Sequence, residues 1–152
     1  LLLCHRVRVF PGGEGYHGGV ESFRKELRLN PNDFESHLFL GALLRQEFDN
    51  DAARGHLDRA LSLRPGDPGV RYQLALVDIA NGELESARQT LEALIQEAPD
   101  WLEAHVSLTT VYYRLRRRED GDRHQAIVKR LRAEDQARRD AAAARKQGGQ
   151  SN

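Results

Sequence analysis

Residues 34–65 read FESHLFLGALLRQEFDNDAARGHLDRALSLRP, and this stretch holds two short amphipathic segments followed by a proline. Over Phe34–Gln46 the apolar residues fall on one broad face at helical spacing. Asp51–Leu63 repeats this spacing with a mixture of small and large apolar residues. Asp33 stands where a helix N-cap belongs, and Pro65 cannot continue the helix before it. The stretch therefore predicts a pair of short helices.

This pattern recurs along the chain with a period of 34 residues. Five columns of similar residues keep the interval, and chance does not align five independent columns. They are Pro31, Pro65 and Pro99; Leu40, Leu74 and Leu108; Phe23, Leu57 and Leu91; Gly19, Ala53 and Ala87; and Gly41, Ala75 and Thr109. Small residues suit positions where two helices approach closely, and large apolar residues fill the remaining space. The sequence thus predicts repeated helix pairs.

The first pair resembles the tetratricopeptide repeat, in which bulky, small, aromatic, alanine and proline residues recur at fixed places. The resemblance is carried by Leu40-Gly41, Leu44, Ala53, Leu57, Ala60 and Pro65. The resemblance of a second copy is carried by Leu74-Ala75, Ala87, Leu91, Leu94 and Pro99. This copy departs from the family at Asp78, where a large apolar residue is usual. The resemblance implies an all-α fold, a right-handed α-solenoid of antiparallel helix pairs stacked into a superhelix.

A third copy begins and then loses the family pattern. Its opening residues are Leu108-Thr109 and Tyr112, but Gly121, Gln125 and Ala133 stand where alanine, an aromatic residue and proline belong. We therefore expect the second helix of this copy to restart after an insertion. It would form a closing helix over about 122–144 that buries Ile127, Val128 and Leu131.

The resemblance also divides the chain into segments. Residues 1–15 are expected to be an irregular or truncated start, because Pro11-Gly12-Gly13 breaks the region where a first helix would lie. A TPR-like domain covers 16–134, with a half repeat at 16–33 and repeats at 34–67, 68–101 and 102–134. A charged helical extension and a disordered tail follow over 135–152.

The half repeat lacks the first helix of its pair. Terminal units of repeat proteins need a polar outer face. We therefore expect the apolar side of Val20, Phe23 and Leu27 to be partly uncovered, which favours self-association.

In the family, the first helices of successive pairs line a concave groove that binds protein or peptide partners. Carried over to this chain, the groove residues are Leu38, Ala42, Arg45, Tyr72, Leu76, Ile79, Val106, Thr110 and Tyr113. The carboxylate clamp of chaperone-binding members is absent, since its positions hold Leu38, Ala42, Gln73, Glu103 and Ser107. We therefore predict an apolar or amphipathic peptide or helix as the ligand. The alternative for Leu76 and Ile79 is packing against neighbouring helices.

Charge is segregated along the chain, although the formal net charge is zero. Residues 1–113 carry 11 basic and 17 acidic side chains, whereas 114–152 carry 12 basic and 6 acidic ones. The alternative function is therefore an adaptor for an anionic surface, nucleic acid or lipid headgroups. It would use Arg114, Arg116, Arg117, Arg118, Arg123, Lys129, Arg130 and Arg132. Interleaved acidic residues favour a solvated, ion-paired helix face instead, so nucleic acid is the weaker hypothesis.

The sequence shows no constellation of catalytic or metal-binding residues. The six histidines do not pair at helical metal-ligand spacing, and Cys4 is the single cysteine. His37 and His105 share one repeat position, two periods apart with Arg71 between them, which indicates a structural role. We predict no enzymatic activity, no small-molecule substrate, no cofactor and no metal.

Length and composition fit one soluble domain. The chain has 152 residues, of which 39% are apolar, and a mean hydropathy of -0.65. It contains no apolar run long enough for a membrane span. Residue 1 is not methionine, so we interpret the chain as a module of a larger protein. The compartment stays open between cytoplasm and periplasm, because one cysteine does not decide it.

Overall fold

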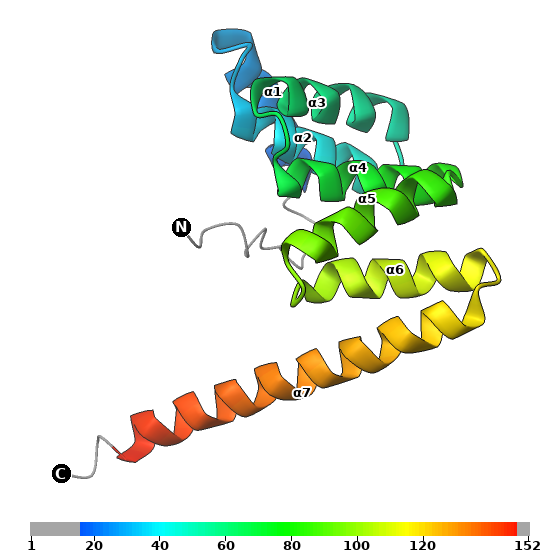
Figure 1. Cartoon of the computed structure of the whole chain (residues 1–152). Coiled ribbons are helices and arrows are strands. Elements are labelled where there is room, and N and C mark those ends of the chain that lie inside the picture. Colours follow the sequence, from blue (N-terminus) through cyan, green and yellow to red (C-terminus); the bar gives the residue numbers. More distant parts are fainter. Residues whose placement is uncertain (1–15, 149–152) are drawn as a thin grey trace. The chain divides into compact units, whose positions relative to one another are not determined.

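The computed structural model describes residues 16–148, whose regular elements are all helices (Figure 1). The helices of this range are α1 (Tyr16–Leu29), α2 (Phe34–Gln46), α3 (Asn50–Leu63), α4 (Pro68–Asn81), α5 (Leu84–Glu97), α6 (Leu102–Arg114) and α7 (Arg118–Gly148). They pack as sequential antiparallel pairs, which confirms the predicted all-α class. The expectations for residues 1–15 and 149–152 lie outside this description.

The described chain forms two compact units, with the boundary between Ala87 and Arg88 inside α5. In the first unit, α2 packs on α3, α1 packs on α2, and α4 packs on both α3 and α2. In the second unit, α6 packs along α7. A hydrogen bond from the Tyr112 hydroxyl to Glu92 joins α6 to α5.

Local capping signals explain where these helices begin and end. The Asp33 carboxylate accepts from the Ser36 backbone N–H at 2.7 Å, and one period later the Asp67 carboxylate accepts from the Val70 N–H at 3.0 Å. Gly82, with φ of 83°, ends α4 in the left-handed conformation that glycine adopts without strain. The predicted N-cap at Asp33 is therefore confirmed, and Asp67 and Gly82 show that the other helix boundaries also follow from short-range chemistry.

The core of the first unit contains members of three columns that repeat at 34-residue intervals, namely Leu40, Ala53 and Leu57. Four side chains of α2 and α3 are fully buried in this core: Leu40, Ala53, Leu57 and Ala60. Gly41 allows the close approach of these two helices, because a Cβ there would lie 2.6 Å from Leu57 Cγ. The size classes read from the sequence therefore correspond to real packing constraints.

The half repeat is better covered than its sequence suggested. Val20 is buried, so the expectation that it would be uncovered is wrong, because α1 packs closely on α2. Phe23 and Leu27 are half-buried, and the Phe23 ring stacks on Phe39 with 5.6 Å between centroids. The outward side of α1 is largely polar, with exposed Glu21, Arg24, Lys25, Glu26 and Arg28. Self-association stays a prediction that now rests on Phe23 and Leu27.

The third repeat keeps its register, so the predicted insertion is wrong. The helix α7 begins at Arg118, exactly one period after Leu84 begins α5. Gly121 replaces the expected alanine because the Tyr113 ring occupies the space of a side chain there; a Cβ would lie 2.7 Å from that ring. Val128 and Leu131 are buried and Ile127 is half-buried, as expected for the closing helix.

The helix α7 continues past the end of α6 and past residue 144, where the closing helix was expected to end (Figure 1). After Leu131 its side chains are almost all exposed up to Arg145. Ion pairs one turn apart, such as Arg130 with Glu134 at 3.8 Å, support this solvated stretch. Across residues 16–148, no helix combines the length and apolarity needed to cross a membrane.

Candidate binding surface

The predicted groove residues of the first unit lie on α2 and α4, two helices in contact. Ala42 is buried, and the five others are half-buried: Leu38, Arg45, Tyr72, Leu76 and Ile79. The Arg45 Nε donates to Gln73 Oε1 at 3.3 Å and so bridges the helices. Burial lowers the pKa of Arg45. This face is therefore partly closed by its own side chains.

The second unit presents the more open part of the predicted surface. Val106, Thr110 and Tyr113 stand at positions i, i+4 and i+7 of α6, which places them along one side of the helix. Thr110 is exposed, while Val106 and Tyr113 are 37% and 39% exposed, unusual for large apolar side chains. We call these three residues the α6 stripe. It offers a ready apolar contact surface two helical turns long.

Tyr113 is held in place by α7. Its ring lies against the Cα of Gly121, and its hydroxyl donates to Asp122 Oδ1 at 2.6 Å and lies 3.0 Å from Gln125 Oε1. The hydrogen bond to Asp122 raises the pKa of Tyr113, so the phenol stays protonated at neutral pH. An aromatic side chain fixed in this way loses little entropy when a ligand binds.

An open depression of about 600 Å³ adjoins Tyr113. It is lined by Tyr113, Arg116, Arg118, Asp122 and Gln125. Neither Asp122 nor Gln125 belongs to the binding surface that the sequence predicts. Gln125 stands where the family has an aromatic residue. This polar replacement is the feature of the sequence that could have indicated a solvent-exposed position on α7.

Two acidic groups, the buried Asp78 and the half-buried Glu92, belong to the framework and not to the surface. Asp78, the departure from the family pattern, is buried and accepts from the Arg54 guanidinium and from Ser86 Oγ at 2.7 Å. The hydrogen bond to Asp78 raises the pKa of Arg54. A carboxylate replaces the usual apolar residue here because an arginine from α3 reaches it, as a buried charge requires.

The second framework group is Glu92, which joins α5 to α6. It accepts from the Tyr112 hydroxyl and from Arg88 Nη1 at 2.6 Å. Burial and the bond to Glu92 raise the pKa of Tyr112 to about 12. Burial alone would raise the pKa of Glu92, but the bonds from Tyr112 and Arg88 outweigh it and lower that pKa. Both side chains are thus committed to structural contacts.

Many of the basic residues assigned to an anionic surface already have carboxylate partners. Arg117 Nε lies 2.8 Å from Asp120, which also pairs with Arg123, and Arg118 lies 3.9 Å from Asp122. With the Arg130–Glu134 pair, at least four of the eight assigned residues are engaged. These pairs favour the solvated, ion-paired face over a phosphate-binding surface.

Metal-ligating residue types are not clustered in the described part of the chain. Between residues 16 and 148, no three histidine, cysteine, aspartate or glutamate side chains are grouped to hold a metal ion. Cys4 and His5 fall outside that range. The histidines do make contacts that helical spacing did not reveal, because their partners lie on different helices.

The fold and its period define the class of protein, a helical-repeat protein built from antiparallel helix pairs. Residues 44–111 match the tetratricopeptide repeat family. The chain belongs to this family, whose members generally serve as protein-interaction modules and whose scaffold fold is typically non-catalytic.

Two curated relatives extend the match. The chain is 31% identical over 111 residues to the TPR repeat-containing thioredoxin TTL4 of Arabidopsis thaliana, covering 72% of this chain and 16% of that protein. It is 29% identical over 102 residues to Superkiller protein 3 of Schizosaccharomyces pombe, covering 67% of this chain and 7% of that protein. The chain thus spans less than a fifth of either relative.

Solved structures show the same fold at lower sequence identity. MamA from Desulfovibrio magneticus RS-1 superposes with a TM-score of 0.70 at 24% identity, over 78% of this chain and 67% of that one. A tetratricopeptide repeat protein from Parabacteroides merdae gives a TM-score of 0.66 at 17% identity, over 78% of this chain and 45% of that one. These likenesses concern the fold alone.

Proposed function

We propose that this chain is a protein-interaction module that binds an apolar or amphipathic peptide or helix against its first helices, as part of a larger protein. The observation that carries the proposal is the α6 stripe, where Val106 and Tyr113 expose apolar surface on either side of Thr110. Apolar surface that the fold leaves in solvent is available to gain free energy when a partner covers it.

The chemistry of the stripe favours an apolar ligand over an anionic one. The Tyr113 hydroxyl is directed to Asp122, and this carboxylate also lies 3.9 Å from Arg118. The depression beside the tyrosine thus has mixed charge, with Asp122 opposing Arg116 and Arg118, whereas the three residues of the stripe are uncharged. Apolar side chains can instead contact Val106 and the Tyr113 ring, with Leu38, Tyr72 and Leu76 contributing a second contact surface on the first unit.

A binding titration with variants of the stripe tests this proposal. The probe is an amphipathic helical peptide selected by display against the wild-type chain. Val106→Asp should weaken its binding by roughly 10-fold or more, as expected when a charge replaces a central apolar contact worth about 1–3 kcal/mol. The matched control is Phe48→Asp, which removes an even more exposed apolar side chain from the α2–α3 turn and should leave affinity unchanged.

The same titration distinguishes the anionic-surface alternative. Binding through the α6 stripe should change little between 50 and 300 mM salt, whereas binding through several phosphates weakens steeply with salt. The variant for this arm is Arg116→Ala. Loss of binding in Arg116→Ala but not in Val106→Asp, together with a steep salt dependence for a nucleic-acid or anionic-vesicle probe, would replace the groove proposal with the alternative.

A further inference from the structure

Two pairs of histidines make the same contact in the two units. In the first unit, His37 on α2 meets His56 on α3, with 3.1 Å between their Nδ1 atoms. In the second unit, His105 on α6 meets His124 on α7, with 2.9 Å between their Nδ1 atoms. Each pair joins the two helices of one repeat, and the pairs stand two periods apart in the sequence. We call these contacts the histidine bridges.

The first histidine of each bridge is buried and anchored through its other nitrogen. His37 is 8% exposed, and its Nε2 lies 3.1 Å from the Pro31 carbonyl oxygen. His105 is 3% exposed, and its Nε2 lies 2.8 Å from the Pro99 carbonyl oxygen. A carbonyl oxygen only accepts, so both Nε2 atoms carry the proton. In this tautomer the Nδ1 atom of each ring is a hydrogen-bond acceptor.

This anchoring assigns the tautomer of the second histidine in each bridge. Because His37 and His105 accept at Nδ1, His56 and His124 must donate their Nδ1–H groups. Both bridges are therefore complete hydrogen bonds when every ring is neutral. A further proton on His56 or His124 enters at Nε2 and leaves this bond in place, but it puts a positive charge into a half-buried contact, and that cost is relieved when the two helices separate.

The surroundings of the α2–α3 bridge disfavour a positive charge. Burial and the neighbouring His37 lower the pKa of His56, and Arg24 on α1 lowers it further. Asp33, the N-cap of α2, acts on the His37 side, but it is itself engaged with Ser36 and lies near Arg64. Arg24 on α1 thus lowers the pKa of His56, the ring that would take up the proton.

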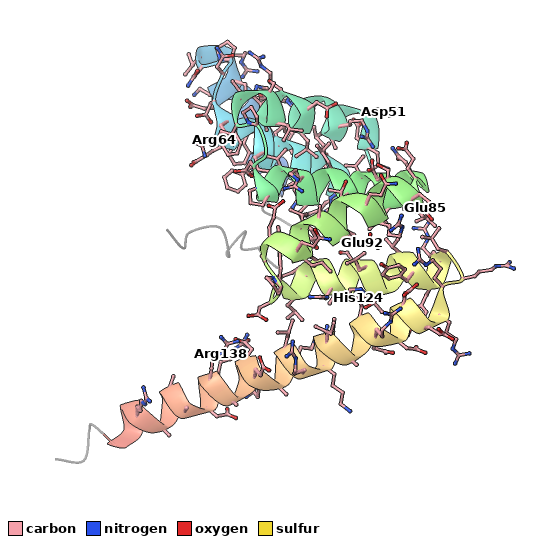
Figure 2. All side chains as sticks on the ribbon, in the orientation of Figure 1. Asp51, Arg64, Glu85, Glu92, His124 and Arg138 are labelled. Atoms are coloured by element: carbon pink, nitrogen blue, oxygen red, sulfur yellow. The ribbon has the colours of Figure 1, made fainter. Side chains whose placement is uncertain are left out.

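The α6–α7 bridge has a more mixed environment. His124 lies on the side of α7 that faces α6, and the Tyr112 ring stacks on it with 5.3 Å between centroids (Figure 2). Burial and His105 lower the pKa of His124, and Arg123 acts in the same direction. Glu92 on α5 and Asp120 on α7 act in the opposite direction.

We propose that the two histidine bridges are a proton-sensitive latch, which holds α3 on α2 and α7 on α6 when the rings are neutral and loosens both helix pairs in mildly acidic solution. The device is independent of what the α6 stripe binds. It predicts that both repeats that carry a bridge lose stability together as pH falls, while the middle repeat, with Arg71 and Thr90 at the equivalent positions, has no such contact to lose.

The direction of the pH effect follows from proton linkage. The folded pKa values of His56 and His124 lie below the value of about 6.5 expected for the unfolded chain, so below that pH the unfolded state binds more protons. The stabilisation is complete above about pH 6.5 and is lost as pH falls toward the folded values. Between pH 7.5 and 5.5, linkage allows each bridge to raise the unfolding equilibrium constant by up to about 10-fold.

Urea unfolding of the full chain at pH 7.5 and 5.5 tests the latch. The variants are His56→Asn and His124→Asn, in which the amide can still donate toward the bare Nδ1 but takes up no proton. Each variant should reduce the loss of unfolding free energy between pH 7.5 and 5.5 by the part that its bridge contributes. The double variant should remove the contributions of both bridges. The control is Thr90→Asn, which introduces the same amide at the equivalent position of the middle repeat and should leave the acid sensitivity unchanged. A double variant with the acid sensitivity of the wild type would overturn the proposal.

Imidazole ¹⁵N NMR on the wild-type chain gives a readout that does not depend on the variants folding. The expected spectra show His37 and His105 protonated at Nε2, and His56 and His124 protonated at Nδ1, at pH 7.5. As pH falls, the native signals of His56 and His124 should both titrate below about pH 6.5. The opposite tautomers, or titration of these rings above that pH, would overturn the latch.

Discussion

At the scale of single residues, the packing of a helix pair depends on complementary sizes. Leu57 is fully buried, and Gly41 provides the space against which its side chain rests. This explains why the two positions keep their size class at 34-residue intervals: a larger residue at 41 or a smaller one at 57 changes the same contact. One residue pair thus determines how closely α2 and α3 approach.

Leu57→Ala should therefore lower the free energy of unfolding by about 2–5 kcal/mol, because it removes buried methyl groups and leaves a cavity beside Gly41. The measurement is the urea midpoint at pH 7.5. Leu29→Ala, at a leucine that is mostly exposed at the end of α1, is the control and should shift the midpoint very little. Equal midpoints for the two variants would contradict the assigned repeat register.

At the scale of elements, α7 combines a packed first part with a solvated second part. Gly121, Val128 and Leu131 are buried, whereas Arg138 belongs to the stretch of helix that extends past α6 (Figure 2). The first part keeps the repeat register, although its residue types depart from the family. The departures are compensated by the neighbouring helix, since Tyr113 fills the space above Gly121.

Gly121→Ala should displace the Tyr113 ring and destabilise the α6–α7 pair by roughly 1–3 kcal/mol, because the new Cβ would lie 2.7 Å from the ring. Hydrogen exchange of α6 and α7 amides measures the effect locally. Adding Tyr113→Ala should relieve the overlap, so the double variant should lose less than the sum of the single ones. The control Gly55→Ala, at a glycine with open space around it, should be neutral or stabilising.

At the scale of the whole molecule, the open question is whether copies of the chain associate. The α1 helix buries Val20 and exposes mostly polar side chains, leaving Phe23 and Leu27 half-buried as the apolar contribution of the half repeat. The α6 stripe adds exposed apolar surface on the second unit. Either surface can serve in self-association, and the two make different predictions for variants.

Sedimentation velocity over a concentration series measures this association. If the half repeat mediates it, Phe23→Ser with Leu27→Ser should shift the distribution toward monomer, while Val106→Asp leaves it unchanged. The reverse pattern would assign self-association to the α6 stripe. A single monomeric species at the highest concentration for the unmodified chain would contradict the prediction.

The sequence by itself determined the class, the helix pairs and the buried columns. Asp33, Asp67 and Gly82 set helix ends through contacts within a few residues, and the apolar spacing of Leu40 and Leu57 sets the buried faces. These signals are short-range or strictly periodic, so they can be read without coordinates.

Only the tertiary structure decided which side chains meet across helices. It showed that Tyr113 rests on Gly121, that Arg54 reaches Asp78, and that His37 and His105 each find a histidine on the next helix. Such contacts join residues 8 to 24 positions apart. They depend on the rotation of each helix about its axis and on the rotamers that its neighbours allow. A pattern of residue types does not fix helix rotation or rotamers closely enough to place two atoms within the few tenths of an ångström that decide a hydrogen bond.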